Sequence, residues 1–287
     1  MSALIDAHVH LIDQRAPGLS YDWASTPHPL FGGVVAPPGS PPWTAERLAG
    51  EPCDPPVTRR VHVQCADAAG DPIAETRFVA AQAQHSGAIH AIVARAPLAA
   101  ADCEAVLEAQ LEASPLVRGI RDMSVAGRLG EPALDRALGA LERRGLSWDV
   151  QCTAAQMGQV ALLAASHPGL QIILAHAGLA TRRTLDDLAD WRAALGALAR
   201  APNVACKLSG FGMGDHRWSV ESWRPWVTSV LELFGAQRIL FGSNWPVDRL
   251  FSSYQAVVDA QLELLASASA DERAAIFAGN AVRVYRL

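Results

Sequence analysis

Short apolar runs rich in Val, Ile and Leu alternate along the chain with longer segments in which apolar residues recur every three or four positions. The short runs are typical of buried strands, and the longer segments are typical of amphipathic helices. Strands are predicted near residues 3–9, 60–65, 89–95, 116–121, 146–152, 170–176, 203–208 and 238–242. Helices are predicted near residues 102–113, 132–144, 154–166, 184–200, 221–234 and 254–267.

Eight strands that alternate with helices favour a closed (β/α)8 barrel, a TIM barrel, because such a barrel typically occupies about 250 residues. We expect one barrel domain over residues 1–287. A doubly wound open sheet is the competing fold. Its dinucleotide-binding form has little support, because no Gly-x-Gly-x-x-Gly turn follows the first predicted strand.

Three segments that follow predicted strands are unusual in length or composition. Residues 12–58 are rich in proline and aromatic residues, and we expect this long loop to fold over the active-site face of the barrel. Residues 209–218 and 243–254 follow the last two strands. Loops after the strands build the active site in such barrels, so Trp23, His216 and Trp245 become candidates for substrate contact.

Composition narrows the classes of partner. The chain has 287 residues, half of them hydrophobic, a net charge of −5 and no cluster of Lys or Arg, which disfavours nucleic-acid binding. No apolar run reaches membrane-spanning length, and Asp6 interrupts the place where a signal peptide needs its apolar core. Five scattered cysteines without Cys-x-x-Cys spacing fit a reduced, cytoplasmic protein. The sequence leaves a homo-oligomer open.

Histidines stand at the predicted carboxyl ends of two strands. His8 and His10 share one face of an extended strand, with Asp6 one step behind, and His176 ends the strand near 170–176. Imidazoles at this spacing bind one metal ion or polarise one substrate atom. The competing interpretation is that each is a hydrogen-bonded histidine of the core.

Further polar residues end other strands, among them Gln64, Arg121, Lys207 and Asn244. Gln64 and Arg121 are candidates for substrate binding. Burying Arg121 or Lys207 without a partner is costly, so each either pairs with Asp122 or Asp149 or binds an anion.

These motifs together resemble one family. They are Ile5-Asp-Ala-His-Val-His10, Gly18-Leu-Ser-Tyr-Asp-Trp23, Val61-His-Val-Gln64, Glu75-Thr76, Arg118-Gly-Ile-Arg121, Leu174-Ala-His-Ala-Gly178, Cys206-Lys-Leu-Ser-Gly210, Leu240-Phe-Gly-Ser-Asn-Trp-Pro-Val247 and Gly279-Asn-Ala-Val-Arg283. In order and spacing they are similar to the amidohydrolase superfamily, and more narrowly to its amidohydrolase-2 branch. That branch includes fuconolactonase, rhamnonolactonase, pyrone-dicarboxylate lactonase and sulfomuconolactone hydrolase.

The resemblance implies that His8, His10 and His176 surround a substrate carbonyl, either directly or through a divalent metal. The chain departs from the superfamily pattern twice. Gln151 and Cys152 stand where firmly metal-binding members end strand five with a histidine, and Asn244 stands where the family has the aspartate that activates water. The cofactor is therefore either one zinc or manganese ion, held by His8, His10 and His176, or none.

An amide orients water but does not accept its proton, so Asn244 is not the general base. His176 and Asp248 are equal candidates for that role, and Asp122 is a further one. The resemblance implies a hydrolase that opens a small cyclic ester, such as a sugar-acid lactone or a lactone of aromatic catabolism. The alternatives are a metal-dependent decarboxylase of the same branch and a barrel that has lost catalysis and binds a small metabolite.

Overall fold

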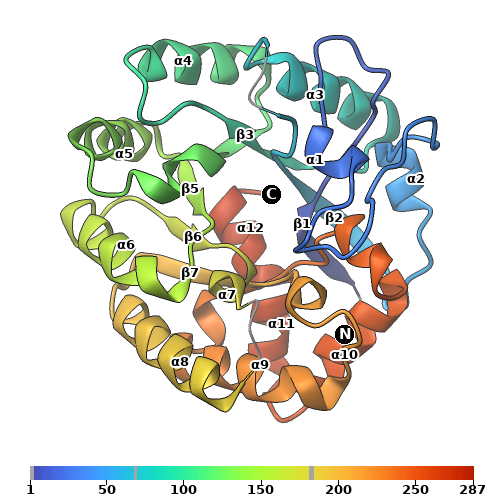
Figure 1. Cartoon of the computed structure of the whole chain (residues 1–287), viewed down its shortest axis with the longest axis vertical. Coiled ribbons are helices and arrows are strands. Elements are labelled where there is room, and N and C mark those ends of the chain that lie inside the picture. The colour runs from blue at the N-terminus through green and yellow to red at the C-terminus, as the bar shows by residue number, and fades with distance from the viewer. Residues whose placement is uncertain (1–2, 68–69, 181–183) are drawn as a thin grey trace.

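Eight parallel strands follow one another in chain order around a barrel, and helices surround them (Figure 1). The structure is a computed structural model that describes residues 3–67, 70–180 and 184–287. The strands are β1 (Leu4–Val9), β2 (Val57–Val63), β3 (Ala91–Arg95), β4 (Val117–Arg121), β5 (Ser147–Val150), β6 (Ile172–Leu174), β7 (Val204–Leu208) and β8 (Ile239–Phe241). The predicted (β/α)8 barrel is confirmed, and the open doubly wound sheet is wrong.

The barrel closes through residues at the end of β1 and just beyond the end of β8. Val9 and Trp245 form a parallel bridge, and His10 N donates to Trp245 O over 2.8 Å. Asn244 N donates to His8 O over 2.9 Å. The seam of the barrel therefore runs between the His-x-His segment and the Asn244 segment.

A buried carboxylate holds this seam. Asp6 Oδ1 accepts hydrogen bonds from His8 N at 3.0 Å and Ser243 N at 2.9 Å, and its Oδ2 accepts one from Tyr254 Oη at 2.7 Å. Asp6 is fully buried. Because Ser243 and Tyr254 follow β8, their hydrogen bonds to Asp6 join β1 to the segment after β8.

The helices around the barrel include α3 (Ala74–Ser86), α4 (Cys103–Ala113), α5 (Pro132–Arg144), α6 (Ala154–Ser166), α8 (Leu185–Ala199), α9 (Val220–Phe234), α10 (Tyr254–Leu264) and α11 (Ala270–Ala274). The segment between β1 and β2 contains the short helices α1 (Asp22–Ser25) and α2 (Ala45–Ala49). No helix in the described ranges is long and apolar enough to cross a membrane.

Two apolar clusters explain this arrangement. The larger one fills the space between strands and helices, and the smaller one fills the barrel with small or branched side chains such as Ala7, Val61 and Val93. Helix α12 (Asn280–Tyr285) lies over the middle of the ring in Figure 1 and adds Tyr285 to the inner cluster. One end of the barrel is thereby filled, and polar side chains collect at the carboxyl ends of the strands.

Candidate active site

A cavity of about 360 Å³ opens at the carboxyl ends of the strands. Strand ends and the turns after them contribute polar side chains to its wall: His10, Gln64, Arg95, Arg121, Gln151, His176 and Asn244. Loops contribute a mostly apolar set: Trp23, His28, Leu30, Phe31, Met123, Met213 and Val247. The cavity thus has polar residues from the strand ends on one side and mostly apolar residues from the loops on the other, as small-molecule sites commonly do.

Three imidazoles lie together beside this cavity; His10 and His176 line it, and the fully buried His8 does not. The ring centroid of His8 lies 4.9 Å from that of His10 and 4.5 Å from that of His176. Simple alternation along β1 predicts that His8 shares a face with Leu4, yet Leu4 packs in the outer cluster. The pairing of β1 with β2 is irregular between Asp6 and Val9, and such an irregularity re-aims side chains.

His8 is fully buried, and neither of its ring nitrogens has a hydrogen-bond partner among the described residues. Burial lowers the pKa of His8 well below its usual value, and the positive charges of neighbours, with His176 the first among them, lower it further. The ring is therefore neutral at pH 7 and offers an unused lone pair. An unpartnered polar atom in such a place is costly, which marks it as a candidate ligand atom.

The hydrogen bonds of His10 fix its tautomer. Nδ1 lies 2.8 Å from Val63 O, and since a carbonyl only accepts, Nδ1 carries the proton. Nε2 then presents a lone pair, and it lies 3.3 Å from Asn244 Oδ1, which is also an acceptor. Burial lowers the pKa of His10 well below its usual value, so protonation does not resolve this meeting of two acceptors.

A neighbouring carboxylate sets the orientation of Asn244. Its Nδ2 donates to Asp248 Oδ2 over 2.7 Å, which leaves Oδ1 facing His10. Two lone-pair atoms that face each other, beside the unpartnered nitrogens of His8, are a donor set that suits a divalent cation. His8, His10 and Asn244 therefore fit a divalent ion, with Asn244 in place of the predicted ligand His176. The ligand atoms of His8, His10 and His176 do not all lie within 4.8 Å of one another.

Asp248 lies behind Asn244 and does not line the cavity. It is 1% exposed, and its Oδ1 accepts a hydrogen bond from Gly212 N at 3.1 Å. Burial raises the pKa of Asp248 to about 7, although the hydrogen bonds from Asn244 and Gly212 oppose the rise. Its pKa suits a base, but its position gives it contact with Asn244 rather than with substrate.

His176 lies beyond the end of β6, in a left-handed turn (α7, His176–Leu179), rather than in the predicted strand. Its φ is 54°, an uncommon conformation for a residue other than glycine. Nδ1 lies 2.9 Å from Ser209 Oγ. A Cβ at Gly210 would lie 2.6 Å from the same nitrogen, so only glycine fits there. Burial, reinforced by Arg121 and Lys207, lowers the pKa of His176 to about 3.

The two cations singled out from the sequence have different partners. Lys207 Nζ forms a fully buried ion pair with Asp149 Oδ2 at 2.6 Å, one of the two predicted pairings. Arg121 does not form the salt bridge considered for it. It donates through Nε to Gln64 Oε1 at 3.3 Å and through Nη2 to Gln64 O. Asp122 instead accepts backbone hydrogen bonds from Leu98 and Ser124.

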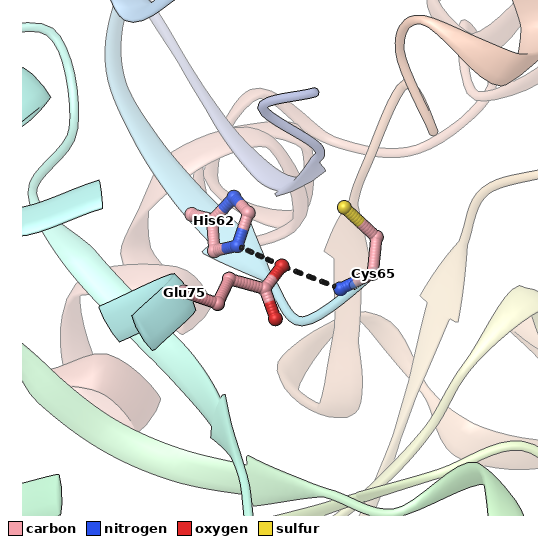
Figure 2. A group of neighbouring side chains, drawn as sticks. All are labelled: His62, Cys65 and Glu75. Carbon is pink, nitrogen blue, oxygen red and sulfur yellow. Dashed lines mark hydrogen bonds and ion pairs between the residues drawn. The ribbon is translucent and has the colours of Figure 1, made fainter. Parts of the chain in front are cut away.

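A second cluster of potential ligands, His62, Cys65 and Glu75, lies beside the site (Figure 2). Glu75 Oε1 accepts hydrogen bonds from His62 Nε2 at 3.1 Å, Cys65 N at 2.8 Å and Ala66 N at 3.1 Å. His62 Nδ1 accepts from Leu11 N at 3.3 Å. Because these bonds already use both His62 nitrogens, the cluster fits a structural clamp on the chain after His10 and Gln64 better than a metal site.

Two residues expected to contact substrate lie outside the cavity wall. Trp245 is 1% exposed and packs edge-on against Trp43 and Tyr254. His216 stacks on Phe251 and hydrogen-bonds to Leu30 O at 3.0 Å. Contacts with neighbouring residues hold both rings outside the cavity wall. The paths of their loops could not be predicted from the sequence.

The structure adds wall residues that sequence reasoning did not select, above all Arg95, Phe31 and Met213. Arg95 ends β3, so the same rule that selected Arg121 could have found it. Phe31 and Met213 lie in long loops, where spacing carries no signal of direction.

Comparison with known proteins agrees with this geometry. A family model described as amidohydrolase matches residues 5–287. The uncharacterized protein y4mH of Sinorhizobium fredii is 34% identical over 299 residues, which cover 99% of both chains. An L-fucono-1,5-lactonase of Burkholderia ambifaria is 32% identical over 227 residues, which cover 74% of this chain and 76% of the lactonase. The crystal structure of an amidohydrolase from Burkholderia multivorans with bound zinc is 27% identical, with a TM-score of 0.80 over 99% of each chain.

Proposed function

Because the chain belongs to the amidohydrolase family, we propose that it hydrolyses the ring ester of a small lactone in the cavity described above. The observation that carries the proposal is the cluster of three neutral imidazoles and Asn244, of which His10, His176 and Asn244 line that cavity. The lactonase relative supports the substrate class, since it covers most of this chain.

His8, His10 through Nε2 and Asn244 through Oδ1 are the groups that would hold a divalent ion such as zinc or manganese. The zinc bound to the structural relative supports a divalent ion in this chain. A bound divalent ion polarises an ester carbonyl and makes water more acidic.

We assign the proton transfers to His176 on position, because it lines the cavity whereas Asp248 does not, although the pKa of about 3 makes His176 the weaker base of the two. Its neutral ring accepts a proton as water attacks the carbonyl, and it returns that proton to the ring oxygen as the acyl C–O bond breaks. The hydrogen bond at Ser209 holds the ring in place for both transfers. Asp248 acts through Asn244, which it orients, and is a positioning residue.

A barrel that had lost catalysis would have little reason to keep His8 as it is. A fully buried imidazole without hydrogen-bond partners destabilises the fold, and an apolar residue of similar size would remove the cost. The retention of such a ring in contact with His10 and His176 favours an active enzyme over a metabolite-binding relic.

The test combines metal analysis with lactone hydrolysis by purified protein, with and without a chelator. His8→Ala is expected to lower metal content, and His176→Ala is expected to keep the metal while kcat falls by about 10²- to 10⁴-fold. His85→Ala is the matched control, because His85 is exposed on α3. Full hydrolysis by the His176 variant would refute its role, and metal loss in that variant would make His176 a ligand. A wild type that opens no lactone would refute the function.

A further inference from the structure

Loop residues rather than strand ends form the apolar side of the cavity. They come from the loops after four strands: Trp23, Leu30 and Phe31 after β1, Met123 after β4, Met213 after β7 and Val247 after β8. Trp23 Nε1 donates to Cys65 O over 2.6 Å, so the polar atom of this indole already has a partner. The Trp23 ring lies 5.6 Å from that of Phe31, and both side chains are partly buried. The loops therefore present an apolar surface to a ligand in the cavity.

The side chain of His216 joins three of these loops at a point outside the cavity wall. Its Nε2 lies 3.0 Å from Leu30 O, and since a carbonyl only accepts, Nε2 carries the proton and donates it. Its ring stacks on that of Phe251, with centroids 4.7 Å apart and an interplanar angle of 9°. His216 follows β7, Leu30 follows β1 and Phe251 follows β8, so one imidazole connects all three loops.

Two glycines make this close packing possible. Gly32 has a φ of 61°, and a Cβ there would lie 2.6 Å from Cε1 and from Nδ1 of His216. A Cβ at Gly212 would lie 2.5 Å from Cδ2 of Phe251. The imidazole therefore packs against the Gly32 backbone as well as the Phe251 ring. These contacts fix a side chain that is exposed at the surface, where side chains otherwise keep their rotamer freedom.

The turn over residues 28–33 is bonded to itself. His28 O accepts a hydrogen bond from Phe31 N at 3.0 Å, and the His28 ring lies 4.6 Å from the Phe31 ring. Leu30 N donates to His28 Nδ1 over 3.1 Å. Because the turn is held together internally, the hydrogen bond from His216 to Leu30 O also sets the position of the Phe31 ring in the wall.

The formal charges of the described wall cancel. Two cations and two carboxylates line the cavity among the residues that the structure describes: Arg95, Arg121, Asp67 and Asp122. The net charge of this wall therefore gives no general preference for an anion or a cation. The apolar surface of the loops remains as a source of selection among substrates.

We propose that His216 is a positioning residue that fixes the loop wall, and that this wall selects a lactone with an uncharged apolar substituent on its ring. This inference rests on the proposed function and deepens it. The ring ester lies at the imidazole side of the cavity, and the substituent packs on Trp23 and Phe31. His216 touches no substrate and acts through Leu30 and Phe31.

The first experiment compares γ-phenyl-γ-butyrolactone with γ-butyrolactone, which lacks the apolar substituent. The measured quantity is the ratio of kcat/KM for the phenyl lactone to kcat/KM for the unsubstituted one. In the wild type this ratio is expected to be about 10 or more, because the phenyl group loses apolar contact with water. His216→Ala is expected to lower the ratio by about 5- to 10-fold, as for a lost hydrogen bond that holds the wall. A merely destabilised protein loses both activities equally and keeps the ratio.

His85→Ala is the matched control, because His85 is exposed on α3 and does not line the cavity. It is expected to keep the ratio of the wild type. A ratio lowered equally in both variants would refute the role given to His216.

Hydrogen–deuterium exchange tests the positioning role without lactone hydrolysis. The amides of Phe31 and Gly32 donate to His28 O, and His216→Ala is expected to raise their exchange rates by about 5- to 10-fold. The amides of α3 are the reference for global unfolding. If no lactone is opened but exchange in the turn rises, the lactonase function fails and the positioning of the turn by His216 stands. If lactones are opened without preference for the phenyl lactone, or if His216→Ala leaves the ratio or the exchange unchanged, the proposal is refuted.

Discussion

The side-chain nitrogen of Asn244 donates a hydrogen bond to the Asp248 carboxylate over 2.7 Å, and this contact decides which atom of Asn244 faces His10. The backbone of Asn244 is left-handed, with a φ of 60°, a conformation that asparagine tolerates better than most residues. The amide thus separates a buried carboxylate from the imidazole group.

The first prediction concerns restoring the family aspartate. Asn244→Asp places two carboxylates at hydrogen-bond distance in a site where both residues are 1% exposed. Two buried carboxyl groups at this distance cannot both ionise without a large energetic cost. We therefore expect a loss of about 1–3 kcal/mol in the free energy of unfolding at pH 8. Urea denaturation measures it.

The double variant Asn244→Asp/Asp248→Asn is the control for that prediction. It reverses donor and acceptor and keeps one amide and one carboxylate in contact. We expect it to recover most of the lost stability. A double variant no more stable than the single one would show that the destabilisation does not come from carboxylate repulsion.

The second prediction concerns the seam of the barrel. Tyr254→Phe removes a side-chain donor to Asp6 Oδ2 and leaves a buried carboxylate oxygen without that partner. We expect a loss of about 1.5–3 kcal/mol in unfolding free energy, measured with urea. Since Phe keeps the ring that packs on Trp245, unchanged stability would contradict the role given to the hydroxyl.

The third prediction concerns the ion pair inside the barrel. Lys207→Met leaves the Asp149 carboxylate buried, with Tyr285 Oη at 2.9 Å and Ser147 Oγ at 3.1 Å as its remaining side-chain donors among the described residues. Breaking a buried pair typically costs about 3–5 kcal/mol, and we expect a loss in that range. The double variant Lys207→Met/Asp149→Asn should recover part of it, because no buried charge remains unpaired. The exposed ion pair between Arg224 and Glu221 is the contrasting control. Arg224→Met should have about the same free energy of unfolding as the wild type.

The fourth prediction follows from Glu75. Burial favours the protonated form, but the hydrogen bonds from His62, Cys65 and Ala66 outweigh it, so the net effect is a lowered pKa. A carboxyl with a lower pKa when folded stabilises the protein above its unfolded pKa, and this contribution disappears as the pH falls through the folded pKa. Glu75→Gln should therefore destabilise by about 2–3 kcal/mol at pH 7, with a smaller difference at acidic pH. Unfolding curves from pH 7 to pH 3 measure it, and a difference independent of pH would contradict it.

The fold could be predicted from the sequence because the spacing of apolar residues, and the residues that interrupt it, are local properties of the chain. Eight apolar runs and the helical spacing between them require no knowledge of contacts, and parallel strands then bring His10, Gln64, Arg121 and His176 to one end. The same logic applies to Arg95, which was overlooked although it occupies an equivalent position.

The directions of the side chains were harder to predict from the sequence. The irregular pairing of β1 re-aims His8, and the left-handed turn places His176 beyond its strand. The burial of Asp248 behind Asn244 depends on a hydrogen bond from Gly212, 36 positions earlier in the chain. Such features arise from contacts between distant segments, which alternation and spacing do not encode.

The seam between β1 and β8 has a consequence for synthesis of the protein. Val9 pairs with Trp245, so β1, which is synthesised before β8, cannot complete the barrel until the segment after β8 has left the ribosome. Until then His8 and His10 have neither Asn244 nor the buried hydroxyl of Tyr254 nearby. A nascent chain that lacks β8 therefore cannot assemble the candidate site, which forms only when the ring is complete.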